Sequence, residues 1–121
     1  MKRLEDHIQT GCVSYFRYAY PNLAKCLTSF AAGFVFAGDN TKRAIVGKRM
    51  KDMGYQNGSP DLVLWRASNG YHGLFIEIKT PTGRQTAAQK EFEKNAINNG
   101  YEYIIVRSVY MFEKEIEEYL K

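Results

Sequence analysis

Three charged residues lie in or beside two apolar segments in the middle of the chain. Asp61 opens the segment 61–66, while Glu77 and Lys79 lie inside the segment 73–79. Burying an unpaired charge is costly, so charges placed here require a reason. Successive strand residues point to opposite faces, and Glu77 and Lys79 therefore share one face. A hairpin of the two segments would bring Asp61 beside Glu77. Two carboxylates and a lysine at one point favour metal-assisted phosphodiester cleavage.

The same residues predict a site for a hard divalent cation, Mg²⁺ or Mn²⁺, which takes oxygen ligands. Asp61 and Glu77 supply carboxylates, and the main-chain carbonyl of Ile78 is a third candidate ligand. Lys79 has two candidate roles that the sequence does not separate. As a cation it would acidify the attacking water and neutralise phosphate charge, and as a neutral amine it would be the base. The competing interpretation is a Glu77–Lys79 ion pair on a half-exposed edge strand.

The pattern along the chain predicts the elements that position these residues. A helix is expected over 3–19, with its apolar stripe at Leu4, Ile8, Cys12 and Phe16. It is followed by a buried strand expected over 28–37 and by a basic helix that ends at about residue 53. Strands over 61–66 and 73–79 are joined at the turn Ser68-Asn69-Gly70. A helix follows that is capped by Thr86 with Gln89 and terminated by Gly100, then a strand over 103–106 and a helix capped by Ser108. This order predicts a single α/β domain over residues 1–121 with a mixed sheet.

The formal net charge of +4 favours an anionic partner, and the positive charge is concentrated in one segment. The candidates for phosphate contacts are Lys42, Arg43, Lys48, Arg49 and Arg84, although a merely solvated helix face explains the run 42–51 equally well. No segment approaches the ~18 apolar residues of a membrane helix, so no membrane partner is expected. Cys12 and Cys26 lack the spacing of a zinc or disulfide framework, which fits a reducing cytoplasm.

Several of these segments together resemble the VRR-NUC (virus-type replication-repair nuclease) branch of the PD-(D/E)xK nucleases. The resemblance is carried by Gly58-Ser-Pro-Asp61, the segment 73–79, the Gln89 helix after Thr82-Gly83, Gly100-Tyr101, and Glu5 followed by Ile8-Gln9. It implies a restriction-endonuclease-like core, in which helices flank a mixed central β-sheet. It also implies a phage or bacterial stand-alone nuclease in the cytoplasm of a bacterial host.

The resemblance further implies that Asp61, Glu77 and the Ile78 carbonyl hold the metal, with Lys79 acting on water and phosphate. Glu5 would be a ligand directly or through water, and Gln89 would orient Lys79 or the phosphate. Each of these two has an alternative. Glu5 is also explained by the helix dipole, and Gln89 by the capping box, two tasks that one glutamine is not expected to serve fully.

The residues and the resemblance together predict a metal-dependent DNA endonuclease. The resemblance implies that cleavage leaves a 5′-phosphate and a 3′-hydroxyl. The expected substrate is branched DNA, such as a four-way junction or a flap, in replication, repair or recombination, with unbranched duplex as the other form. A homodimer is expected, since Tyr15, Phe16, Tyr18 and Tyr20 are more aromatic residues than one helix face can bury. The alternatives are a catalytically inert DNA-binding module of a replication complex and a sequence-specific restriction endonuclease.

Overall fold

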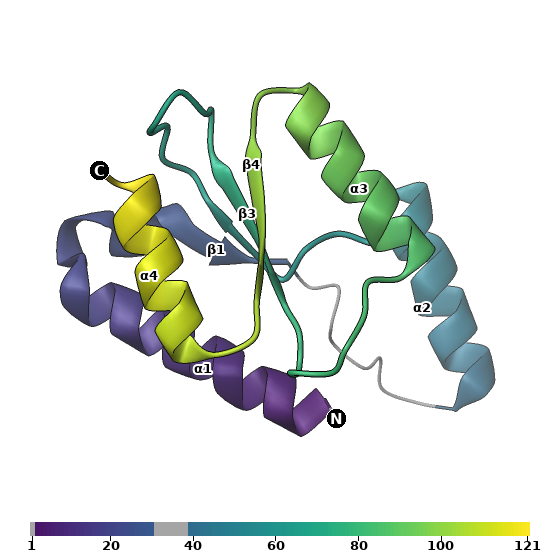
Figure 1. Ribbon diagram of the computed structural model, residues 1–121. Coiled ribbons are helices and arrows are strands. Elements are labelled where there is room, and N and C mark those ends of the chain that lie inside the picture. Colours follow the sequence, from purple (N-terminus) through teal and green to yellow (C-terminus); the bar gives the residue numbers. More distant parts are fainter. Residues whose placement is uncertain (1, 31–38) are drawn as a thin grey trace.

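A mixed β-sheet forms the centre of the molecule. The computed structural model describes residues 2–30 and 39–121. In this part of the chain the strands lie in the order β1 (Leu27–Ser29), β2 (Leu62–Leu64), β3 (Leu74–Ile78) and β4 (Glu102–Val106). β2 is antiparallel to both β1 and β3, whereas β3 and β4 are parallel. The predicted α/β class with a mixed central sheet is confirmed (Figure 1).

Helices cover both faces of this sheet. α1 (Lys2–Ala19) and α4 (Val109–Tyr119) pack together on one face, and α3 (Ala87–Asn98) lies on the other (Figure 1). α3 also provides the crossover that two parallel strands require. A 3₁₀ helix, η1 (Pro21–Cys26), links α1 to β1, and α2 (Asn40–Asp52) precedes the loop that leads into β2. No helix in residues 2–30 or 39–121 has the length and apolar character needed to span a bilayer.

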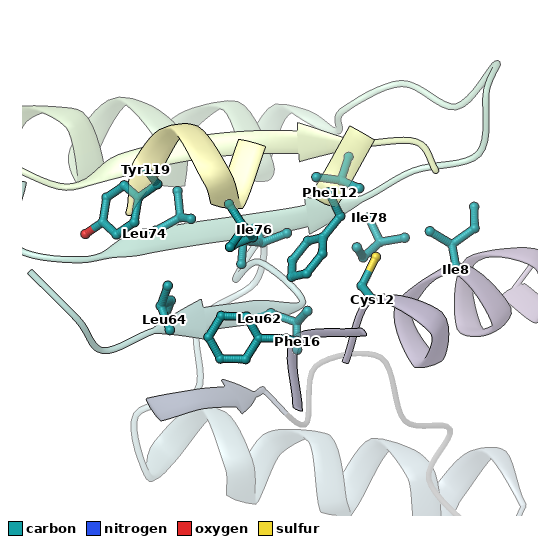
Figure 2. Packing of buried hydrophobic residues seen from close by; sticks show 12 residues of the cluster. Ile8, Cys12, Phe16, Leu62, Leu64, Leu74, Ile76, Ile78, Phe112 and Tyr119 are labelled. Atoms are coloured by element: carbon teal, nitrogen blue, oxygen red, sulfur yellow. The ribbon is translucent and has the colours of Figure 1, made fainter. Parts of the chain in front are cut away.

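The main core lies between the sheet and the α1–α4 pair. Alternate residues of β2 and β3 face it, and Ile8, Cys12 and Phe16 from α1 meet them together with Phe112, Ile116 and Tyr119 from α4 (Figure 2). The predicted helical stripe is confirmed from Ile8 onwards, but Leu4 is 47% exposed. Ile8 already packs beside Ile78 at the end of β3 (Figure 2). The preceding helical turn, with Leu4, therefore extends past the core.

The opposite face of the sheet carries a smaller core and all three charged residues singled out above. Val63, Phe75 and Tyr103 are buried there against Ala96 of α3. Glu77 and Lys79 follow Phe75 on the same face because β3 alternates regularly. The helix α3 therefore covers the face on which the site is built.

Local capping and turn signals place the ends of several elements. The side chains of Asp39, Thr86 and Ser108 each accept a hydrogen bond from the backbone N–H three residues later, at the starts of α2, α3 and α4. The predicted hairpin turn has positive φ at Asn69 (55°) and Gly70 (87°), as a type I′ turn requires. The turn lies between β2 and β3 and lets them pair antiparallel, so the strand ends that bear Asp61 and Glu77 lie side by side.

At two places, Trp65 and β1, side chains are more exposed than the strand pattern indicates. Trp65, inside the segment predicted as a strand over 61–66, is 55% exposed, because β2 ends at Leu64 and Gly73 opposite has no side chain to cover the indole. Of the buried strand expected over 28–37, the described residues include Thr28 and Ser29 in β1, and both are exposed at the sheet edge. Residues 31–37 of that expected strand lie outside the described residues.

The aromatic residues of α1 are mostly accommodated inside the fold. Phe16 is buried, and the Tyr15 ring contacts both Tyr20 and Phe112 edge to face. Tyr18, at 88% exposed, is the member of that group left on the surface. The surplus of aromatic side chains expected at a subunit contact is therefore much smaller than the sequence indicated.

Candidate active site

Asp61 and Glu77 are neighbours across the β2–β3 pair. Leu62 pairs with Ile76, and extending this register by one residue places Asp61 opposite Glu77. Asp61 is anchored on both sides, since its N–H donates to the Ile76 carbonyl (3.1 Å) and its Oδ2 accepts from the Ile78 N–H (2.7 Å). The buried Pro60 fixes the approach of the chain to this position. The expected pairing of the two carboxylates is thus present.

Both carboxylate oxygens of Glu77 have partners from other elements. Gln89 Nε2 of α3 donates to Oε2 (3.1 Å), and the Tyr103 hydroxyl of β4 donates to Oε1 (3.4 Å). Glu77 itself is only 3% exposed. Its side chain is therefore held in one orientation beside Asp61.

The electrostatic environment of Glu77 disfavours its charged form. Burial, followed by the charge of Asp61 and a hydrogen bond with it, raises the pKa of Glu77 from its ordinary 4.5 to about 9. Lys79 and Tyr103 act in the opposite direction and lower this pKa. Without a metal, the acid pair therefore holds a proton at neutral pH.

This donor set fits a hard divalent cation. A positive charge between the two carboxylates would relieve the repulsion that contributes to the raised pKa of Glu77. Mg²⁺ binds through one or two carboxylates while keeping several waters. Within the described residues, no three side chains of His, Cys, Asp or Glu gather as a metal site. A cation here would accordingly use the two carboxylates with main-chain and water oxygens, for which the Ile78 carbonyl stays the predicted third ligand.

Lys79 is buried at the end of β3 and held there by its backbone. Its N–H donates to the Val106 carbonyl (2.9 Å), and its side chain is largely covered. Arg107 fastens the loop that follows, because its Nη1 donates to the carbonyls of Thr80 (2.6 Å) and Gly83 (2.8 Å). A methyl group added at Gly83 would lie 3.5 Å from Lys79 Cδ, so the loop packs against the lysine stem.

Gln89 serves the capping box and the carboxylate at the same time, contrary to expectation. The side-chain Oε1 of Gln89 accepts from the main-chain N–H of Thr86 (2.9 Å), and the main-chain N–H of Gln89 donates to Thr86 Oγ1 (3.1 Å). Its Nε2 remains available and donates to Glu77. The two tasks use different atoms of one amide, so they do not compete. The contact is with Glu77 instead of Lys79.

Glu5 does not join the acid pair. It is partly exposed on the first turns of α1, and the described residues contain no three-acid group with Asp61 and Glu77. A direct ligand role for Glu5 beside these two residues is therefore not supported. The reason is spatial, since α1 packs on the Ile78 face of the sheet and the carboxylates project from the other face.

The predicted phosphate-binding side chains are all on the surface. Lys42, Arg43, Lys48 and Arg49 are exposed on α2, and Arg84 is exposed in the loop after Lys79. Lys48 pairs with Asp52 (2.9 Å), but both side chains are more than half exposed, so this pair constrains the lysine weakly. α2 buries none of its residues. Its basic side chains thus contribute nothing to the core.

Two residues near the site were not anticipated as functional, Tyr103 and Arg107. The sequence pattern indicates Tyr103 only as part of an apolar strand. Its position opposite Phe75 puts its hydroxyl on the face of Glu77, which strand alternation would have indicated once the β3–β4 register was known. Arg107 lies one residue after β4, and no sequence pattern connects it with the loop 80–83 that it holds.

Comparison with known proteins gives one consistent result. The family model described as the VRR-NUC domain matches residues 36–110. A solved structure described as "VRR_NUC domain protein" superimposes with a TM-score of 0.77 at 25% sequence identity, covering 95% of this chain and 86% of that one. No curated protein matches the chain. Residues 36–110 include Asp61, Glu77 and Lys79.

Proposed function

Since the chain belongs to the VRR-NUC family, whose domain is of the nuclease type, we propose that it is a metal-dependent DNA endonuclease. The observation that carries this proposal is the buried acid pair Asp61–Glu77, with Lys79 on the same sheet face. A protein that only binds DNA gains nothing from two carboxylates beside a phosphate, because they repel it. A hydrolytic site needs such carboxylates as metal ligands.

The proposed cation, Mg²⁺ or Mn²⁺, would be held by Asp61, Glu77 and the main-chain carbonyl of Ile78. When bound, it supplies Lewis-acid polarisation of the phosphate and a more acidic water. Gln89 and Tyr103 would keep Glu77 in its orientation as a ligand. The ammonium group of Lys79 would offset the negative charge that develops on the phosphate. Attack by water and cleavage of the P–O3′ bond leave a 5′-phosphate and a 3′-hydroxyl.

DNA would be held electrostatically by Lys42, Arg43, Lys48, Arg49 and Arg84. Such contacts position the backbone without reading sequence, which favours branched DNA over a specific sequence as the substrate. A twofold homodimer would place two active sites on opposing strands, and Tyr18 on the outer side of α1 is a candidate contact. Glu5 is proposed to act only through water, so Glu5→Gln should slow cleavage without abolishing it.

The test is a cleavage panel of junction, flap, single-stranded and duplex DNA with Mg²⁺ and with Mn²⁺. We expect branched substrates to be cut, Glu77→Gln to be inactive, and Glu115→Gln to match the wild type. Glu115 makes the same chemical change on the exposed surface of α4, on the far side of the sheet. Uncut DNA throughout the panel would overturn the proposal, as would full activity in Glu77→Gln. Discrete fragments from unbranched plasmid would indicate a restriction endonuclease instead.

A metal titration separates the enzyme from a catalytically inert DNA-binding module. Calorimetry with Mn²⁺ should give a binding isotherm for the wild type that disappears in Asp61→Asn. A module without catalysis should bind DNA yet give the same weak metal signal in both proteins.

A further inference from the structure

A groove of about 390 Å³ lies between α3 and the sheet, next to the acid pair but not on it. Its wall is aromatic and consists of Trp65, Phe75, Phe92 and Tyr101. The Phe75 ring is 5.1 Å from the rings of both Phe92 and Tyr101. These contacts fix the rings in place before any ligand arrives, which lowers the ordering cost of binding.

Trp65 stands apart from the other rings because it is exposed. It follows β2 opposite Gly73, and a methyl group at Gly73 would lie 3.2 Å from the Tyr101 ring. The absence of a side chain at Gly73 therefore lets Trp65 and Tyr101 border the same space. An exposed indole at the mouth of an aromatic groove offers a flat surface for stacking.

The polar lining of the groove consists of amides and one acid instead of cations. Gln56, Asn57 and Asn95 line it, and their side-chain amides make no hydrogen bond to residues 2–30 or 39–121. Glu91 is also part of the lining, while lysine and arginine are not. Phosphate would be repelled here. A flat heterocycle fits, because amides and carboxylates pair with the edges of nucleobases.

The groove and the candidate active site lie next to each other along β3, on the same face of the sheet. Phe75 and Glu77 are two residues apart on one face, about 7 Å along the strand. Tyr103 connects them, since it packs on Phe92 and donates to Glu77. A nucleotide whose phosphate lies at Asp61 and Glu77 could reach the groove with its own base or an adjacent one.

We propose that this groove binds an unpaired nucleobase of the DNA substrate next to the cleavage site. This inference rests on the proposed nuclease function, which identifies the substrate as DNA. It adds a physical reason for a preference for branched DNA. A base inside a duplex must be unstacked at a cost of a few kcal/mol, whereas a base at a flap or branch point is already unpaired. Branched DNA fills the groove at lower cost than duplex does.

Trp65 is the single tryptophan of the chain, so its fluorescence reports on the groove directly. In EDTA, a short oligothymidylate should quench this fluorescence on titration. An abasic oligomer of the same length and charge should not. Equal quenching by the two oligomers would overturn the proposal, because the signal would then come from the backbone alone.

Two variants extend the test to the flap substrate. Trp65→Ala should weaken flap binding in EDTA about 5- to 100-fold, the range expected for loss of one stacked base. Asn95→Ala should weaken flap binding and leave binding of the abasic oligomer unchanged. Tyr110→Ala removes another exposed aromatic ring, from α4 on the far side of the sheet, and should have no effect. If Trp65→Ala binds as tightly as Tyr110→Ala, the groove does not hold a base.

These results are separable from those of the nuclease proposal. A protein that cuts DNA with Mn²⁺ but shows no dependence on Trp65 refutes the base site alone. If base-bearing strands selectively quench the Trp65 fluorescence but no DNA is cut, the base-binding proposal is kept and the nuclease proposal is refuted.

Discussion

Glu77 is held on all sides, by a tyrosine, a glutamine and a second carboxylate, in a position where its negative charge is unfavourable. An acid with a raised pKa in the folded state contributes stability below its unfolded pKa and loses it as the pH rises. The residue therefore costs stability in the metal-free protein at neutral pH. This cost is the expected consequence of building a cation site in a sheet.

Glu77→Gln should make the metal-free protein more stable while removing its activity. The gain should be small at pH 5, near the ordinary pKa of 4.5. It should grow up to about pH 9, because the unfolded wild type releases the Glu77 proton that the folded protein keeps. At pH 8 it should exceed about 1 kcal/mol, the equivalent of a shift by one pKa unit. Thermal denaturation in EDTA across this pH range measures it. A constant difference in stability at all pH values would contradict the assignment.

Gln89 permits a separation of folding from positioning. Thr86→Ala removes the helix cap and should cost about 1 kcal/mol while leaving the Glu77 contact and the cleavage rate nearly intact. Gln89→Ala keeps the Thr86 Oγ1 bond, which uses the main-chain N–H of residue 89, but it removes the Oε1 bond to the Thr86 N–H and the contact with Glu77. It should slow cleavage about tenfold or more, as for other residues that orient metal ligands. Denaturation and single-turnover rates for the two variants decide this. Equal rates would reduce Gln89 to a capping residue.

At the scale of elements, the loop that delivers Asp61 depends on close packing against α3. Gly58 has a φ of 84°, and a methyl group there would lie 2.5 Å from the backbone of Ala88. A side chain at this position must displace the loop or the helix. Either movement would change the placement of Asp61, three residues further along.

Gly58→Ala should therefore destabilise the fold by about 2 kcal/mol or more, from the strain of positive φ and from overpacking, and should reduce cleavage. Gly70→Ala is the matched control, since Gly70 has a φ of 87° and nothing within 4 Å of the added methyl. It should cost only the conformational strain, about 1 kcal/mol, and should keep activity. Urea denaturation compares the two. A similar loss in both variants would show that the contact with Ala88 is unimportant.

The parts of the fold that could be predicted are those encoded by neighbouring residues. Helical periodicity predicted α1 from Ile8 onwards, and capping residues predicted the starts of α3 and α4. Strand alternation also put Glu77 and Lys79 on one face. What depended on distant pairing could not be predicted. The Tyr103 contact needs the parallel β3–β4 register, and the exposure of Trp65 depends on a glycine, Gly73, just before the neighbouring strand β3.

At the scale of the whole molecule, charge is divided between the two sides of the sheet. α2 carries the basic residues, and α4 on the other side carries Glu113, Glu115, Glu117 and Glu118 (Figure 1). Such a division orients a polyanion towards one side of the protein. We expect DNA to approach from the side of α2 and α3, where the acid pair and the groove also lie.

Replacing Lys42 and Arg49 together with Gln should weaken binding to all DNA forms alike. The slope of log K against log salt concentration should fall by about 2, because each substitution removes one charged group that would bind a phosphate. Lys114 and Lys121, exposed at α4 and the chain end, provide the control double substitution with the same charge change. Fluorescence anisotropy at several salt concentrations measures the slopes. Equal slopes for the two double variants would remove α2 from the DNA-binding surface.

The central claim is that Asp61, Glu77 and Lys79 form one hydrolytic site, and Lys79 tests it most directly because it is not a proposed metal ligand. Lys79→Met preserves most of the side-chain volume and should retain folding and Mn²⁺ binding. The single-turnover rate of branched-DNA cleavage with Mn²⁺ should then fall at least about 100-fold, as expected when a group that stabilises transition-state charge is removed. A rate within about twofold of wild type would contradict the account.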